Sequence, residues 1–201
     1  MAKKSLGIGE MLVLGIILVC YAVASCTVLA IVNNFTSPKI LQNQIDKANE
    51  AMRIVFSDAD SFEKVEDFES SSDSTITLSD FYLAKKGSEI IGGVIQVAGP
   101  TYDKGKIIIG LDKSKTVTGM QFLELTDSPG FGSKAKDSSY LVKSGKTFYD
   151  QFTGMDATKG FIINETFDAI SGATITSNSV ANLMKTGTNC LIKYFESHGV
   201  N

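Results

Sequence analysis

Two polar loops of the chain contain the residue types that could bind a charged small molecule. The loop over residues 168–177 reads Asp-Ala-Ile-Ser-Gly-Ala-Thr-Ile-Thr-Ser and precedes a helical stripe of apolar residues. Its small residues leave the backbone accessible, so that hydroxyl and N–H groups together could donate hydrogen bonds to a phosphate group at a helix start. An ordinary helix start, capped by Ser177 or Ser179, would show the same pattern.

The other loop, residues 127–132, reads Asp-Ser-Pro-Gly-Phe-Gly. Proline presets the backbone for the second position of a tight turn, and glycine readily takes the positive φ that such turns often need. Taken alone, this loop is most simply a turn that follows a strand. By itself, this loop therefore does not indicate a binding site.

Short β-rich segments between turn residues lead up to the first of these loops. Lys86-Gly87, Gly99-Pro100 and the turn at 112–115 separate runs of β-branched and apolar residues. The expected strands are 81–84, 90–98, 106–110 and 117–123. Consecutive strands at this spacing predict an antiparallel meander. Further along, 139–142 and 146–152 are ambiguous helical pieces, and 161–164 is a short expected strand.

Apolar residues at helical spacing predict a closing helix over 179–195. Cys190 falls within it, where a small buried thiol is its expected role. Strands in the middle of the chain with helices at both ends predict the α+β class. In full, we expect one N-terminal transmembrane helix, then an extracytoplasmic domain with an antiparallel sheet flanked by helices.

An uncharged apolar stretch near the N-terminus is the basis for the transmembrane helix. No Asp, Glu, Lys or Arg occurs in the 28 residues between Glu10 and Lys39, and 11–32 are nearly all apolar. About 20 apolar residues span a bilayer. Lys3 and Lys4 favour a cytoplasmic N-terminal tail. The chain is therefore divided into a cytoplasmic tail (1–10), a transmembrane helix (11–33) and an extracytoplasmic domain (34–201).

Two other interpretations of this apolar stretch are less favoured. A cleaved secretory signal has a shorter apolar core of about 7 to 15 residues. A lipoprotein signal is suggested by Val-Ala-Ser-Cys at 23–26, with Cys26 as the acylated residue, but the sequence after Cys26 stays apolar where a lipoprotein tether is polar. An uncleaved single-span anchor is therefore favoured over both.

The segment after the anchor is expected to form a second helix and then an acidic surface excursion. Ser37-Pro38 is a helix-start signal, and apolar residues at helical spacing extend the helix to Val55. Residues 57–80 hold eight acidic residues against one basic residue. An acidic, serine-rich segment of this kind is typically a solvated surface, and no function is assigned to it.

Composition excludes several classes of function. A net charge of −3 and a pI near 5.2 give no basic surface for nucleic acid. Cys20, Cys26 and Cys190 show neither a paired framework nor a metal-binding spacing. The single histidine, His198, stands near the C-terminus without a second ligand, so that neither a metal site nor histidine catalysis is expected.

The two loops together resemble a known family of flavoproteins. Asp-Ala-Ile-Ser-Gly-Ala-Thr at 168–174 resembles the flavinylation motif of the FMN-binding subunits RnfG and NqrC. Glu-Leu-Thr-Asp-Ser-Pro-Gly-Phe-Gly at 124–132 resembles the Glu-His-x-Glu-Thr-Pro-Gly-Leu-Gly stretch of the same family, in the same order. Leu125 stands at the histidine position, so no imidazole is expected near a flavin. The lack of long insertions favours the RnfG type over NqrC.

The resemblance implies a membrane-anchored electron-transfer subunit with covalent FMN, and no turnover by the isolated chain. Thr174 would be esterified to the FMN phosphate by a flavin transferase that uses FAD, with Asp168 as a candidate aid to that enzyme. Ser171, Thr176 and Ser177 are candidate phosphate donors, and Gly172 and Ala173 keep the approach open. The expected ring-facing wall is Asp127, Ser128, Pro129, Gly130, Phe131 and Gly132. The implied partners are membrane subunits RnfA, RnfD and RnfE and peripheral subunits RnfB and RnfC.

Two alternatives to this interpretation remain open, and a third is disfavoured by the sequence. The chain could be an NqrC-type subunit of a Na⁺-translocating NADH:quinone reductase. It could also be a membrane-tethered extracytoplasmic binding module without a cofactor. A flavin-binding sensor domain of a membrane regulator would share the motif, but it predicts further membrane spans and cysteine clusters, which this sequence lacks.

Overall fold

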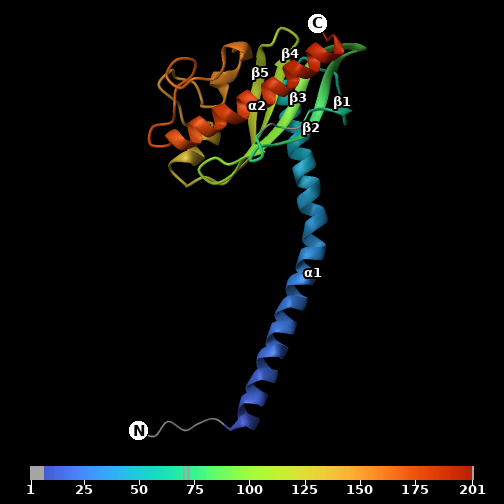
Figure 1. Cartoon of the computed structure of the whole chain (residues 1–201), viewed down its shortest axis with the longest axis vertical. Coiled ribbons are helices and arrows are strands. Elements are labelled where there is room, and N and C mark those ends of the chain that lie inside the picture. The colour runs from blue at the N-terminus through green and yellow to red at the C-terminus, as the bar shows by residue number, and fades with distance from the viewer. Residues whose placement is uncertain (1–6, 70, 72, 201) are drawn as a thin grey trace. The chain divides into compact units, whose positions relative to one another are not determined.

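The computed structural model describes residues 7–69, 71 and 73–200 (Figure 1). The chain divides into two compact units, up to Asp46 and from Lys47 onward, and each is described by itself. The first unit consists of one helix, α1 (Ile8–Val55), whose last residues belong to the second unit. By its length and apolar composition, α1 could cross a membrane.

Helix α1 corrects the prediction of a separate helix that begins at Ser37-Pro38. The helix runs through Pro38 without a break. The Ser37 hydroxyl donates to the Asn33 side chain at 3.1 Å, within the helix, and caps nothing. Proline has no backbone N–H and so removes one hydrogen bond, and the helical residues on both sides carry the helix across it.

The second unit contains a five-stranded antiparallel sheet with the strands in chain order. The strands are β1 (Ser61–Val65), β2 (Thr77–Lys86), β3 (Glu89–Gly99), β4 (Gly105–Asp112) and β5 (Val117–Leu125). This order confirms the predicted meander and the α+β class. Each of the four predicted strands lies within one of β2 to β5, all of which are longer than predicted.

Strand β1 was not predicted, because it lies inside the acidic segment that was interpreted as a surface excursion. It is an edge strand paired only with β2. Its Phe62 and Val65 are half-buried, whereas Ser61, Glu63 and Lys64 are exposed. Charged residues on an edge strand discourage pairing with other chains, and they also hide the strand pattern in the sequence.

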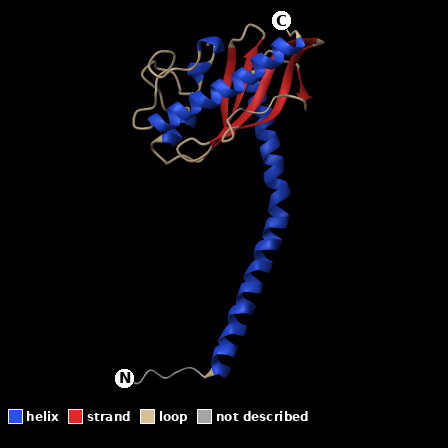
Figure 2. Ribbon diagram, viewed as in Figure 1, coloured by secondary structure: helices blue, strands red, loops and turns tan. Residues whose placement is uncertain are grey.

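Helix α2 (Thr174–His198) packs on one face of the sheet (Figures 1 and 2). Side chains alternate between the faces of a strand, so Ile95, Ile107 and Ile109 contact the α2 side while Val94 and Ile108 face the other side. Residues 51–56, at the end of α1, cover that second face. Both faces of the sheet are therefore buried within this unit.

Two glycines permit the close approach of residues 55 and 56 to the sheet. Gly110 and Gly119 are directly paired on β4 and β5. A Cβ atom at Gly119 would lie 2.9 Å from the Val55 Cα atom, and one at Gly110 would lie 2.9 Å from the Val55 carbonyl oxygen. Since both obstacles are backbone atoms, only glycine fits at these two positions.

Residues 126–173, which connect β5 to α2 along the chain, form an irregular lobe. Its regular elements are three short 3₁₀ turns, η1 (Gly132–Lys136), η2 (Asp150–Phe152) and η3 (Ala157–Lys159). The helical pieces considered for 139–142 and 146–152 are therefore loop apart from η2. The strand predicted over 161–164 is only an isolated bridge between Ile163 and Phe167. Packed phenylalanine rings, including Phe148, Phe152 and Phe167, hold the lobe together.

Candidate functional site

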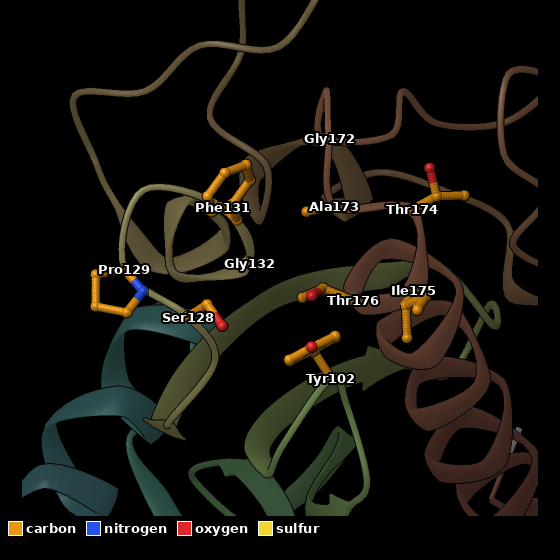
Figure 3. Close-up of a pocket in the computed structure, with 10 residues that line it drawn as sticks. All are labelled: Tyr102, Ser128, Pro129, Phe131, Gly132, Gly172, Ala173, Thr174, Ile175 and Thr176. Atoms are coloured by element: carbon orange, nitrogen blue, oxygen red, sulfur yellow. The ribbon is translucent and has the colours of Figure 1, made fainter.

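A cavity of about 590 Å³ lies where three segments of the second unit meet (Figure 3). The segments are the turn between β3 and β4, the loop after β5, and the start of α2. Its lining residues are Tyr102, Ser128, Pro129, Phe131, Gly132, Gly172, Ala173, Thr174, Ile175 and Thr176. The volume is in the range of pockets that bind small molecules and cofactors.

The start of α2 supplies free backbone donors to this cavity. The helix begins at Thr174, five residues earlier than predicted, with Ala173 as an N-cap that provides no side-chain hydrogen bond. Among the described residues, the N–H groups of Thr174, Ile175 and Thr176 have no partner. The first turn contains no acidic residue. An anion is therefore favoured here by both the free N–H groups and the helix dipole.

Ser177 is not the helix cap, which corrects one of the two capping predictions. Its hydroxyl is fully buried, donates to the Ala173 carbonyl at 3.0 Å and accepts from the Ile170 N–H at 3.0 Å. Ser179, the other predicted cap, lies in the second turn of the helix. The α2 helix can start earlier than predicted because the Ser177 hydroxyl, from within the helix, forms hydrogen bonds with backbone groups of the preceding turn.

Thr174 presents a free hydroxyl beside these donors. Its side chain is exposed, and its hydroxyl has no hydrogen-bond partner in the part of the chain that the structure describes. Figure 3 shows this hydroxyl pointing away from the helix. The neighbouring Thr176 differs, because its hydroxyl donates to the Asp127 carboxylate at 2.5 Å and is buried. Thr174 is thus the accessible hydroxyl of the first turn.

Asp127 lies behind the cavity wall and is only 4% exposed. Its carboxylate accepts hydrogen bonds from the hydroxyls of Thr101 and Thr176 and from the N–H groups of Tyr102 and Asp103. Burial by itself would raise the pKa of Asp127, but these four donors outweigh it and hold the pKa below its usual value. Asp127 is therefore an ionised, fully hydrogen-bonded residue of the framework.

Glycines shape the loop after β5. Gly130 has a φ of 77°, which suits the turn that brings the Phe131 N–H to the Ser128 carbonyl at 3.2 Å. A Cβ atom at Gly132 would lie 2.7 Å from Asp127 Cβ and would also collide with Thr176. Gly132 therefore allows the loop to pack directly against the start of α2.

Exposed apolar side chains surround the mouth of the cavity. Tyr102 is 64% exposed, and Phe131 and Ile175 are each 59% exposed. They come from three different segments yet line the same cavity. Exposed apolar groups around a concave site are typical of a surface that a ligand covers. A ligand with a flat aromatic part and a phosphate would match these side chains and the donors of α2.

The structure brings eight of the predicted site residues together in the cavity wall and leaves five outside it. The eight are Ser128, Pro129, Phe131, Gly132, Gly172, Ala173, Thr174 and Thr176. Outside the lining lie Asp127, Gly130, Asp168, Ser171 and Ser177. The carboxylate of Asp168 accepts from the Ser144 N–H at 2.7 Å, so it holds a neighbouring loop.

Two lining residues were missed from the sequence, Tyr102 and Ile175. Tyr102 lies two residues after Pro100, in the turn between two predicted strands. An aromatic residue in a turn is not part of a strand that would bury it, and this position was the signal in the sequence that could have indicated it. Ile175 lies inside the motif over 168–177 but was not among the predicted site residues. Isoleucine is usually buried, so its residue type gives no signal for an exposed position in a site.

Comparisons with known proteins match two regions of the chain. Residues 101–189 match the family model of the FMN-binding domain, and residues 1–55 match the RnfG N-terminal region. The first match contains the turn, the loop and the helix start that line the cavity. The second contains all of α1.

Curated relatives resemble most of the chain. The G subunit of the proton-translocating ferredoxin:NAD(+) oxidoreductase complex of Clostridium ljungdahlii is 26% identical over 79% of each chain. The G subunit of the Na(+)-translocating ferredoxin:NAD(+) oxidoreductase complex of Acetobacterium woodii is 28% identical, over 92% of this chain and 91% of its own. The C subunit of the Na(+)-translocating NADH-quinone reductase of Pasteurella multocida is 33% identical, but only over 52% of this chain and 43% of its own.

The fold, the cavity and the matched domain together define a flavin-binding domain that follows an N-terminal apolar helix. By its length, its apolar composition and its match to the RnfG N-terminal region, that helix fits a membrane anchor. Within this class, the two family models and the long alignments with G subunits support the RnfG type.

Proposed function

We propose that this chain is the FMN-carrying electron-transfer subunit of an ion-translocating ferredoxin:NAD oxidoreductase, with FMN esterified through its phosphate to Thr174. The observation that carries the proposal is the exposed, unpaired Thr174 hydroxyl at the first residue of α2, on the wall of the cavity. The similarity to G subunits and the matched FMN-binding domain support FMN as the ligand.

The residues present fit each part of FMN. The free N–H groups of Thr174, Ile175 and Thr176, together with the α2 dipole, would stabilise the charge that the phosphodiester keeps. Tyr102 and Phe131 would provide apolar contact for the ring system. The bound FMN would supply the redox chemistry, while the protein sets its position and its exposure to water.

Attachment needs a nucleophile and a leaving group, and the chain supplies the nucleophile. The Thr174 oxygen would form a bond to the FMN-side phosphorus of FAD. The bond between that phosphorus and the bridging oxygen breaks, AMP leaves, and the hydroxyl proton passes to a base of the flavin transferase. The open backbone at Gly172 and Ala173 leaves this hydroxyl accessible. Asp168 and Ser171 would belong to the segment that the transferase recognises.

The anchor would hold the flavin domain on the outer face of the cell membrane. The proposed partners are the membrane subunits RnfA, RnfD and RnfE and the peripheral subunits RnfB and RnfC. Covalent attachment has a clear use on that face, because a released flavin would be lost by dilution. Electrons would enter and leave through partner subunits, so the isolated chain should catalyse no complete reaction.

The proposal is tested by co-expressing the chain with a flavin transferase and examining the denatured protein on a gel. The wild-type chain should carry flavin fluorescence that survives denaturation. Thr174→Ala should lose it, and Thr174→Ser should keep it, because serine retains the nucleophilic oxygen. Thr186→Ala, a partly exposed position further along α2, is the matched control and should keep the fluorescence. A fluorescent Thr174→Ala chain would contradict the assignment.

The similarity to the Pasteurella multocida protein makes an NqrC-type subunit the second candidate. Both candidates share the flavin site, so the gel experiment does not separate them. The match of residues 1–55 to the RnfG N-terminal region favours the first. Affinity purification of the tagged chain from its own membranes should recover Rnf subunits, and recovery of NADH-quinone reductase subunits would support the second candidate.

A further inference from the structure

The carboxylate of Asp127 connects three segments that form the cavity. Its Oδ1 atom accepts from the Thr101 hydroxyl at 2.5 Å and from the Asp103 N–H at 2.9 Å. Its Oδ2 atom accepts from the Thr176 hydroxyl at 2.5 Å and from the Tyr102 N–H at 3.3 Å. Thr101 to Asp103 belong to the turn after β3, Thr176 to the first turn of α2, and Asp127 itself begins the loop after β5.

These contacts leave Asp127 little capacity to bind a ligand directly. Each carboxylate oxygen already accepts two hydrogen bonds, and the residue is 4% exposed. It is also absent from the cavity lining, whereas its partners Tyr102 and Thr176 are part of it. A residue in this arrangement acts through its partners.

Steric contacts fix the same arrangement from the other side. Gly132 packs so closely on Asp127 and Thr176 that a Cβ atom there would lie 2.6 Å from Asp127 Oδ2. The loop that carries Phe131 is therefore held against the same carboxylate. One buried carboxylate therefore holds three parts of the cavity in place. These are the apolar walls at Tyr102 and Phe131 and the helix turn that carries Thr174.

We infer that Asp127 is a positioning residue that sets the distance between the Tyr102 wall and the first turn of α2. Its hydrogen bond to Thr176 fixes the turn that carries Thr174, and its bonds at residues 101–103 fix the opposite wall. We call the contacts of Asp127 with residues 101–103 and Thr176 the Asp127 clamp. The link of this clamp to a bound flavin rests on the proposed function, but the clamp itself does not. Thr176, whose proton is directed to Asp127, is accordingly part of this clamp and not a phosphate donor.

The clamp is tested first without any flavin. Hydrogen exchange of the full-length, flavin-free chain in detergent should show protected amides at Tyr102 and Asp103. In Asp127→Asn these two amides should exchange at least tenfold faster, while sheet amides keep their rates. Asp156→Asn is the matched control, because Asp156 also accepts from a threonine hydroxyl and an N–H group but lies at the N-cap of η3. Unchanged rates at 102 and 103 would overturn the inference.

The consequence for the flavin is tested with a milder change at the other end of the clamp. Thr176→Val removes one hydroxyl and leaves Thr174 in place, so flavin should still become attached. The visible circular dichroism of the attached flavin should fall at least twofold, because the ring is no longer held in a fixed environment. Thr176→Ser should restore the wild-type signal.

The outcomes separate the two proposals. A wild-type chain that takes up no flavin would defeat the proposed function, and the exchange experiment would still decide on the clamp. A flavinylated Thr176→Val chain with the wild-type dichroism would defeat the positioning role. If Asp127→Asn fails to fold, Thr101→Val removes one donor from the same carboxylate and should raise the exchange rates at 102 and 103.

Discussion

Three neighbouring hydroxyl residues at the start of α2 have different environments. Ser177 is bonded to backbone groups of the preceding turn, and Thr176 is bonded to Asp127. Thr174 alone of these three is exposed. Residue type is the same or similar at all three positions, so the proposal that Thr174 carries the flavin rests on local geometry.

Asp127 makes stability depend on pH in the acid range. Its pKa is lower in the folded chain than in the unfolded chain, where an aspartate titrates near about 3.9. The stabilisation is thus fully present above that value and is lost as the pH falls through the folded pKa. At pH 7, Asp127→Asn should lower the free energy of unfolding by roughly 2 kcal/mol.

Urea unfolding of the two chains at a series of pH values checks this prediction. The difference between wild type and Asp127→Asn should shrink steadily below about pH 4. The exposed Asp137, whose pKa is also lowered by hydrogen bonds from Ser139, provides the control Asp137→Asn, which should show a much smaller difference at pH 7. A difference for Asp127→Asn that stays constant down to about pH 2 would contradict the account.

Cys190 should be chemically inert in the folded protein. Burial, followed by the nearby Glu69 carboxylate, raises the pKa of its thiol to about 11. In a Cys20→Ser, Cys26→Ser background, a thiol-specific reagent at pH 8 should therefore label the folded chain at least a hundredfold more slowly than the unfolded chain. Equal rates would show that the segment at Glu69, whose carbonyl accepts from the Cys190 thiol, does not cover this residue.

At the scale of elements, the sheet tolerates side chains differently on its two faces. Gly119→Ala would force a Cβ atom against the Val55 backbone, which is part of a helix and cannot move aside easily. Gly93→Ala would instead meet the ends of side chains such as Leu191, at 3.0 Å or more. Overpacking of this kind costs about 1–3 kcal/mol.

Thermal unfolding of the two variants measures this difference. Gly119→Ala should fall at the upper end of that range and Gly93→Ala at the lower end, because flexible side chains can yield. A Gly119→Ala chain as stable as wild type would show that residues 55 and 56 do not pack on the sheet as described.

The sequence predicted those elements whose pattern is local. Strands β2 to β5 have β-rich runs between clear turn residues, and the apolar stretch of α1 is continuous. Strand β1 was missed because an edge strand carries charges. The end of the helix at Val55 was predicted, but the continuity of α1 through Pro38 was not, because Ser-Pro is typical of a helix start. Helix α2 begins at Thr174, earlier than predicted, because the Ser177 hydroxyl forms hydrogen bonds with the backbone of the preceding turn. Helix propensity does not reveal such a contact.

The same distinction explains what could be predicted of the site. The motif over 168–174 and the loop over 127–132 pointed to two of the three segments that line the cavity. The role of Asp127 depends on a contact with Thr176, 49 residues away. Tyr102 joins the cavity only through the turn between β3 and β4. Contacts across such distances depend on the packing of the sheet against α2, which no short window of sequence contains.

At the scale of the whole molecule, the account requires the flavin domain to lie outside the cytoplasm. In a Cys20→Ser, Cys26→Ser background, Lys143→Cys adds an exposed thiol on the domain. A membrane-impermeant maleimide should label it in intact cells, or in spheroplasts if an outer membrane is present. Lys4→Cys, in the N-terminal tail, is the control and should be labelled only after the membrane is opened. Labelling in the reverse order would place the domain in the cytoplasm.

The central claim is most directly tested by the intact mass of the chain purified from its own membranes, followed by fragmentation of the peptide that contains residues 168–177. The account predicts a chain heavier by one FMN less one water, with the added mass on Thr174. A chain without added mass, or one whose flavin is released by simple unfolding, would contradict it.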